Sequence, residues 1–183
     1  VCEVLRRSAM QEAILVDRVD ATAKFADDPR FTFIQGDISS LGAWAGNKLD
    51  YVISLAGIAS PKLYRKEPIA CIDVNVNGCR KALQLAQEQG ARIIHMSSSE
   101  VIGDAEVVPT PEYYIGRINT RSVRSSYDLS KMMGETLCHV YHEYYGTDVI
   151  TVRPYNVVGP GLNQHDGRIF SAFANAIVTN SPM

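Results

Sequence analysis

The stretch "LDYVISLAG", residues 49–57, decides the fold of this chain. Its middle is an almost unbroken run of apolar residues, bounded by Asp50 on one side and Gly57 on the other. A short apolar run between turn-forming residues is typical of a β-strand. Because the run does not alternate between apolar and polar residues, it predicts a strand buried on both faces, as in a parallel sheet.

Further apolar runs of this kind recur along the chain, at residues 13–17, 31–37, 91–99 and 148–156. Helical patterns fill residues 67–90 and 125–146, and each ends at a glycine, Gly90 or Gly146, the residue that most often follows a helix. Strands that alternate with helices predict right-handed βαβ units. We therefore expect an α/β fold with a doubly wound parallel sheet, and polar loops over residues 104–124 and 159–168.

In open sheets of this class, ligands bind beyond the carboxyl ends of the strands. The topology alone therefore directs attention to the residues that follow each apolar run. They are Asp17, Gly36, Asp37, Ala56, Gly57, Ser97 to Glu100, Tyr155 and Asn156.

The composition is that of an ordinary globular domain, with 46% hydrophobic residues, 21% charged residues and a net charge of −2. There is no basic excess to predict a nucleic-acid partner. No stretch approaches the roughly 18 apolar residues of a membrane span, and "VCEVLRRSAM" (1–10) has no long apolar segment of the signal-peptide kind. We expect neither nucleic acid nor membrane as a partner.

The cysteines, Cys2, Cys71, Cys79 and Cys138, are scattered and form no C-x-x-C pair. This spacing argues against a zinc site and against a disulfide scaffold, and it favours a reducing, cytoplasmic location. The histidines do not suggest a metal either. His95 is expected in the core, His139 and His142 on a helix surface, and His165 in a loop near the ligand.

Tyr127 and Lys131 stand four residues apart, which places them on one face of the helix predicted at 125–146. An ammonium group beside a phenol favours the phenolate and lowers its pKa from about 10 toward neutral. Such a tyrosine can take a proton from an alcohol. By spacing alone, the pair is equally consistent with a solvated helix face.

The context of this pair changes that balance. A strand that runs into "SSSEVIGD" (97–104), followed by "YDLSK" (127–131), resembles the extended short-chain dehydrogenase/reductases, the NAD-dependent nucleotide-sugar epimerases, dehydratases and decarboxylases. The resemblance extends over essentially the whole chain. Its other pieces are "GDI" (36–38), "LAGIASP" (55–61), "NVNG" (75–78) and "RPYNVVGPG" (153–161).

The resemblance implies a Rossmann-like fold, an NAD cofactor and a catalytic set. Ser98 matches the catalytic hydroxyl, Tyr127 the acid/base and Lys131 the residue that orients the nicotinamide ribose and lowers the pKa of the tyrosine. Glu100 is implied to position the sugar ring or a water molecule. The implied cofactor-binding residues are Asp17, Asp37, Ile38, Ala56, Gly57, Asn75, Tyr127, Lys131 and Pro154. The acidic Asp17 favours NAD over NADP, because a carboxylate repels a 2′-phosphate.

The implied substrate is a nucleotide-diphosphate sugar, bound by Ser99, Asn156 and Arg168. The pair Ser99-Glu100 is similar to that of UDP-glucuronate decarboxylases, which form UDP-xylose through a 4-keto sugar that loses carbon dioxide. A 4,6-dehydratase or a 4-epimerase remains the alternative activity, and a non-catalytic NAD-binding module the alternative outside enzymes. No metal is implied.

The resemblance also implies a domain plan. Residues 1–158 correspond to the NAD-binding domain, without its first strand and glycine-rich turn, and residues 159–183 to the start of the substrate-binding region. Apolar and aromatic residues beyond the needs of one sheet face lie along 132–145, as in families that pair this helix across a dimer. We therefore expect a homodimer through the helix that carries Tyr127.

Overall fold

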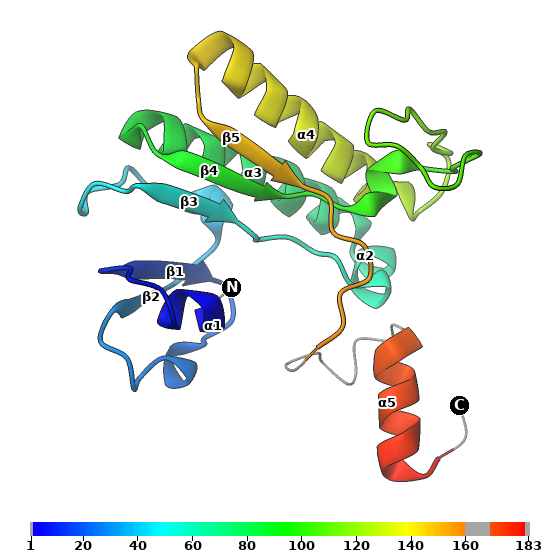
Figure 1. The fold of residues 1–183 in the computed structure, drawn as a ribbon, viewed down its shortest axis with the longest axis horizontal. Helices are drawn as coiled ribbons and strands as arrows, with labels where there is room; N and C mark the ends of the chain where they lie inside the picture. Colours follow the sequence, from blue (N-terminus) through cyan, green and yellow to red (C-terminus); the bar gives the residue numbers. More distant parts are fainter. Residues whose placement is uncertain (1, 160–168, 182–183) are drawn as a thin grey trace. The chain divides into compact units, whose positions relative to one another are not determined.

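The computed structural model describes residues 2–159 and 169–181, and Figure 1 shows their fold. The chain forms two compact units, Val1–Ala45 and Gly46–Met183. Within the described residues, no helix combines the length and the apolar character needed to cross a membrane.

The first unit is built on a pair of parallel strands, β1 (Ala13–Asp17) and β2 (Phe31–Gln35). Its remaining elements are α1 (Cys2–Arg6), η1 (Thr22–Lys24) and η2 (Ile38–Ser40). β2 ends earlier than the sequence predicted. The reason is that Asp37 leaves the strand to cap η2, where its Oδ1 accepts a hydrogen bond of 2.8 Å from the Ser39 amide.

The second unit contains three parallel strands in the order β3–β4–β5. The strands are β3 (Tyr51–Ser54), β4 (Arg92–Met96) and β5 (Val149–Val152). The helices are α2 (Pro61–Lys66), α3 (Pro68–Gln89), η3 (Ser99–Ile102), α4 (Ser125–Tyr145) and α5 (Ile169–Thr179). The helices predicted at 67–90 and 125–146 are confirmed as α3 and α4. Gly90 and Gly146 end them with φ of 62° and 67°, a conformation that costs glycine little.

The core of the second unit lies between the sheet and the helices α3 and α4, which run side by side along it (Figure 1). Its fully buried members include Leu83 and Ala86 on α3, Ile93 on β4 and Cys138 on α4. The strands of this sheet are rich in apolar residues because one face of the sheet packs against this core.

The opposite face of the same sheet differs from the prediction. Burial on both faces was expected, but Ile150 and Val152 are 42% and 38% exposed. They pair in register with Ile94 and Met96, so the four side chains belong to the face turned away from Ile93. The prediction was wrong for β5 because α3 and α4 cover only one side of the sheet.

The hydrogen-bond ladders form two sheets, β1–β2 in the first unit and β3–β4–β5 in the second. All of these strand pairs are parallel, as the sequence predicted.

Candidate active site

The second unit has a cavity of about 290 Å³ at the carboxyl ends of its strands. Residues that follow β3, β4 and β5 line it, together with residues of α2 and α4. Predicted site residues that line the cavity are Gly57, Ser98, Ser99, Glu100, Tyr127, Lys131, Pro154 and Asn156. The structure therefore brings together side chains that are up to a hundred positions apart in the sequence, as the parallel topology requires.

Ser98 is placed by the turn that ends β4. It is the N-cap of η3, with Oγ accepting a hydrogen bond of 3.3 Å from the Glu100 amide. The side chain is buried, with 7% of the residue exposed. Ser98 and Tyr127 both line the cavity, and Ser98 acts to lower the pKa of the Tyr127 phenol.

Tyr127 lies in the first turn of α4 and is 8% exposed. Its ring stacks on the ring of Tyr64 from α2, with centroids 5.3 Å apart and planes 11° apart. Offset stacking of this kind fixes a ring in place. Tyr64 is a site residue that sequence reasoning missed, although it stands in a short helix directly after the "LAGIASP" segment.

The pKa of Tyr127 is raised, mainly by burial, and a hydrogen bond from Ser98 opposes this shift. The sequence predicted a lowered pKa, so this prediction was wrong for the structure as it stands. Lys131 is 7% exposed, and its Nζ donates a hydrogen bond of 2.9 Å to the Met96 carbonyl oxygen. Burial lowers the pKa of the Lys131 ammonium. Burial of the phenol therefore outweighs any help from this ammonium.

Glu100 is held by an arginine that the sequence analysis did not single out. Arg124, in the residue just before α4, forms a short ion pair with Glu100, and its Nε lies 3.4 Å from Asp128 Oδ2. Burial raises the pKa of the Asp128 carboxyl, and Arg124 opposes the shift. Arg124 also lines the cavity, so this cation and the Glu100 carboxylate stand beside Tyr127. In the sequence, Arg124 could have been noticed only because it stands three residues before Tyr127.

Gly57 and Asn75 form a tight contact behind the cavity. Asn75 is 2% exposed; its Oδ1 accepts a hydrogen bond of 3.1 Å from the Ile58 amide, and its Nδ2 donates one of 2.9 Å to Ser130 Oγ. A Cβ on Gly57 would lie 2.3 Å from Asn75 Oδ1 and 3.7 Å from Lys131 Nζ. The backbone at Gly57 can thus lie this close to the Asn75 side chain only because glycine has no Cβ. Ala56 beside it is exposed.

A second ionic contact anchors the strand ends. Arg153 binds both oxygens of Glu135 on α4, at 2.8 and 2.7 Å, and Ser97 Oγ donates to Glu135 Oε1 at 2.6 Å. Arg153 Nη1 also donates to the Glu112 carbonyl oxygen at 2.6 Å. Bidentate arginine–carboxylate pairs are geometrically specific. Arg153 therefore joins the end of β5 to α4 and to the 104–124 loop, and Glu135 adds Ser97, which follows β4, to the same contact.

The remaining predicted residues lie elsewhere. In the first unit Asp17 is the last residue of β1 and Asp37 follows β2, and each carboxylate accepts a hydrogen bond from the backbone amide two positions later in the chain. Ile38 begins η2 beside Asp37. Hydrogen bonds from Ser39 lower the pKa of Asp37. Arg168 and His165 lie outside the described residues.

Comparison with known proteins agrees with this geometry. A sequence profile described as the NAD dependent epimerase/dehydratase family matches residues 1–183. The chain belongs to this family. The fold class predicted from the sequence is thereby confirmed, as is the resemblance to the extended short-chain dehydrogenase/reductases.

Curated relatives within the epimerase/dehydratase family carry one recurring name. UDP-glucuronic acid decarboxylase 5 of Arabidopsis thaliana is 37% identical over 174 residues, which are 92% of this chain and 50% of that protein. UDP-glucuronic acid decarboxylase 1 of Xenopus tropicalis is 39% identical over 126 residues, 69% of this chain and 30% of that protein. The chain spans at most about half the length of these relatives.

Solved structures of the family share the fold. A UDP-galactose 4-epimerase matches with a TM-score of 0.79 and 29% identity, over 98% of this chain and 58% of that protein. A UDP-glucose 4-epimerase from Thermotoga maritima matches with a TM-score of 0.84 over 100% of this chain and 60% of that one. At 20% identity, the second likeness bears on the fold alone.

Proposed function

We propose that the protein is an NAD-dependent enzyme that oxidises a nucleotide-diphosphate sugar at carbon 4 and decarboxylates UDP-glucuronate to UDP-xylose. One observation carries the proposal: Ser98, Glu100, Tyr127 and Lys131 line a single cavity at the strand ends. The names of the curated relatives support the choice of substrate.

The residues of the cavity suit an NAD cofactor. Lys131 is a buried cation that lines the cavity together with Gly57. We assign Gly57, Tyr127, Lys131 and Pro154 to the nicotinamide side, and Asp17, Asp37 and Ile38 to the adenosine side. When bound, NAD supplies a reversible acceptor for the hydride of carbon 4.

Tyr127 is the proton acceptor in this proposal. Tyr127 and Ser98 line the same cavity, so we assign both hydroxyls to the 4-hydroxyl oxygen of the sugar. Tyr127 removes the hydroxyl proton as carbon 4 is oxidised, and Ser98 donates a hydrogen bond to the ketone oxygen that forms. A ketone at carbon 4 is β to the carboxylate on carbon 5, which makes loss of carbon dioxide easy.

We assign Glu100 and Arg124 to the sugar as well. The Glu100 carboxylate, oriented by Arg124, positions the ring or the water that returns a proton to carbon 5. Ser99 and Asn156 line the same cavity and are assigned to the substrate. We also assign Arg168 to the substrate diphosphate or carboxylate. We further propose that the substrate-binding region, which would include Arg168, begins at residue 159.

The direct test is incubation of the full-length protein with UDP-glucuronate and NAD. We expect carbon dioxide and a UDP-pentose, and a loss of about 10²–10⁴ in kcat for Tyr127→Phe, the usual contribution of general acid–base catalysis. Tyr113→Phe, at a tyrosine that is 86% exposed, is the matched control and should retain activity. Unchanged activity in Tyr127→Phe would contradict the catalytic assignment.

A 4-epimerase is the second candidate, because a UDP-galactose 4-epimerase shares both sequence and fold with this chain. Interconversion of carbon-4 epimers without carbon dioxide would favour it. A 4-keto-6-deoxy sugar from a thymidine- or GDP-hexose would instead identify a 4,6-dehydratase. Turnover of none of these by a protein that binds NAD would leave a non-catalytic NAD-binding module.

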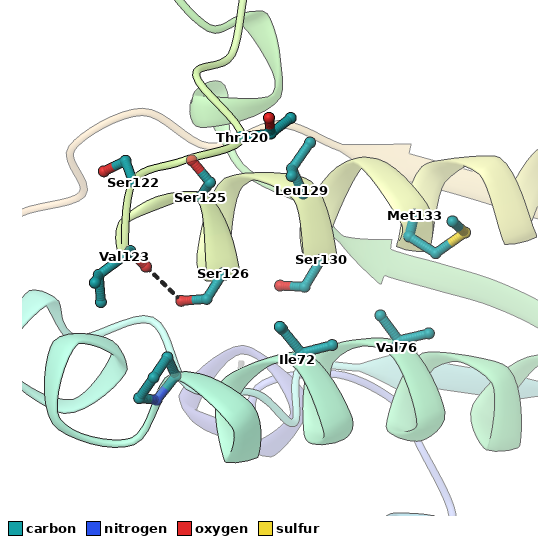
Figure 2. Close-up of a pocket in the computed structure, with 11 residues that line it drawn as sticks. Ile72, Val76, Thr120, Ser122, Val123, Ser125, Ser126, Leu129, Ser130 and Met133 are labelled. Carbon is teal, nitrogen blue, oxygen red and sulfur yellow. Dashed lines mark hydrogen bonds between the residues drawn. The ribbon is translucent and has the colours of Figure 1, made fainter.

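We propose that α3 and α4 also form a homodimer interface. A groove of about 520 Å³ lies between the two helices, and Figure 2 shows Ile72 and Val76 of α3 facing Ser126 and Ser130 of α4 across it. Leu129 and Met133 on its rim are 37% and 48% exposed. A second copy offers the same two-helix face, so a two-fold contact pairs each apolar rim with its equivalent.

We propose a cytoplasmic location. Cys71, Cys79 and Cys138 are all free thiols, which suits a reducing compartment. Fractionation of cells that express the tagged full-length protein would test the assignment, and recovery with the secreted fraction would contradict it.

A further inference from the structure

A second group of chemically reactive side chains lies in the core of the second unit. Cys79 of α3, His95 of β4 and Cys138 of α4 bring their ligand atoms within 4.8 Å of one another. Each residue is only 1–2% exposed. None of the three lines the cavity described above, so the proposed reaction makes no use of them.

The spacing of the cluster matches that of metal ligands. Bonds of about 2.3 Å to sulfur and 2.1 Å to nitrogen, at an angle of about 110°, put the two ligand atoms about 3.6 Å apart. Cys79 Sγ lies 3.5 Å from His95 Nδ1, against 4.0 Å from Nε2. Nδ1 is therefore the nitrogen that faces a shared metal position.

The kind of metal follows from the ligands. Among the residues that the structure describes, the cluster offers three ligand atoms, two thiols and one imidazole. Zinc held by two cysteines and one histidine needs a fourth ligand such as water, which solvent cannot supply to residues only 1–2% exposed, whereas soft thiolates also bind Cu(I). We propose that Cys79, His95 and Cys138 form a buried site for a soft monovalent metal ion, Cu(I).

The charge balance favours a monovalent ion. Binding converts two thiols into thiolates, so Cu⁺ plus two thiols and one imidazole gives a complex of charge −1 and releases two protons to solvent. The Lys131 ammonium acts on both Cys79 and His95, and its positive charge offsets the complex. Glu135 also faces His95 and Cys138, but Arg153 neutralises it. A divalent ion would leave one buried positive charge uncompensated, which is unfavourable.

The histidine is suited to this role. Neutral imidazole is a common metal ligand, and Nδ1 of His95 lies 3.5 Å from Cys79 Sγ inside the buried cluster. The sequence analysis argued against a metal because it sought paired cysteines close in sequence. Here α3, β4 and α4 supply one ligand each, a pattern that sequence spacing does not reveal.

The test is anaerobic titration of the full-length protein with Cu(I) in competition with bicinchoninate. We expect one tightly bound Cu(I) per chain, and an X-ray absorption spectrum with two sulfur neighbours and one nitrogen neighbour. Because two protons leave, the apparent affinity should rise by up to about a hundredfold per pH unit below the thiol pKa values. Cu(I) should also raise Tm.

Variants decide whether the site is the one proposed. Cys79→Ser and Cys138→Ser should each lower the Cu(I) affinity at least tenfold and abolish the rise in Tm. Cys71→Ser, at a fully buried cysteine of the same helix α3, should bind as the wild type does. Equal loss in Cys71→Ser, coordination by sulfur alone, or tight Zn²⁺ binding in place of Cu(I) would overturn the proposal. Should a serine variant fail to fold, the absorption spectrum of the wild type decides alone.

Discussion

At the scale of the residue, the proton chemistry is set by how deeply Tyr127 is buried. Burial raises the pKa of its phenol, and the hydrogen bond from Ser98 works against this. Below its pKa the phenol keeps its proton, so proton removal from a sugar becomes easier as pH rises. Ser98 therefore adjusts the base as well as contacting the substrate.

Ser98→Ala should move the alkaline rise of kcat/KM to higher pH, because it removes the one contact that lowers the pKa of Tyr127. The activity at neutral pH should fall roughly 10- to 100-fold, the range for a lost hydrogen bond to a charged group. A pH–rate profile measures both effects. Ser8→Ala, at an exposed serine that does not line the cavity, is the control, and a Ser98→Ala profile that falls without shifting would contradict the link to Tyr127.

Gly57→Ala should destabilise the protein by about 1–3 kcal/mol, the usual range for overpacking. The added methyl would lie 2.3 Å from Asn75 Oδ1, whose side chain is buried and hydrogen-bonded. Gly42→Ala is the matched control, because nothing lies within 4 Å of its Cβ position. Denaturant unfolding measures the free energy of unfolding of the two variants. Equal effects would show that the Asn75 side chain moves aside at little cost.

At the scale of the element, β4 carries a buried histidine that makes the stability of the fold depend on pH. His95 on β4 has a pKa lowered to about 4 by burial, so the folded protein holds this imidazole neutral. The unfolded chain takes up a proton near pH 6.5. Stability from the neutral His95 is therefore complete above about pH 6.5 and is lost as pH falls toward 4.

His95→Gln should flatten the free energy of unfolding between pH 6.5 and 4, where the wild type loses up to about 3 kcal/mol through this residue. Chemical denaturation at several pH values provides the measurement. His139→Gln is the control, because His139 is an exposed histidine on α4. An equally steep loss in His95→Gln would assign the pH dependence to other groups.

The elements themselves were largely predictable, and their ends show why some were not. The ends of α3 and α4 were predicted correctly, because a glycine such as Gly90 or Gly146 directly signals where a helix ends. The bounds of β1 were predicted correctly, and the other four strands were predicted too long on the carboxyl side. Asp37 and Ser98 leave the strands to cap short 3-10 helices, and a strand reading that follows hydrophobicity does not detect such capping.

At the scale of the whole molecule, the groove between α3 and α4 bears on assembly. Leu129→Asp should convert the proposed dimer into a monomer, because two carboxylates would be buried at a two-fold contact. Analytical ultracentrifugation at micromolar concentration measures it. Ile115→Asp, at a loop residue that is 90% exposed, is the control and should stay dimeric. A monomeric wild type would contradict the interface.

The candidate site was predictable to the extent that topology determines it. Ser98, Glu100, Tyr127, Lys131 and Asn156 meet at one cavity because the carboxyl ends of parallel strands share an edge. Contacts made through space were not predictable. The stack of Tyr64 on Tyr127 and the ion pair of Arg124 with Glu100 depend on how α2 and α4 pack, which no local pattern encodes.

One contact in the core restricts how this protein can evolve. Gly134 on α4 faces His95, and a Cβ at position 134 would come within 2.8 Å of the imidazole Nε2. The two positions therefore share one volume, and a larger residue at either demands a smaller one at the other. Among related chains, we expect positions 95 and 134 to change together, so that a lineage which loses the histidine gains freedom to replace the glycine.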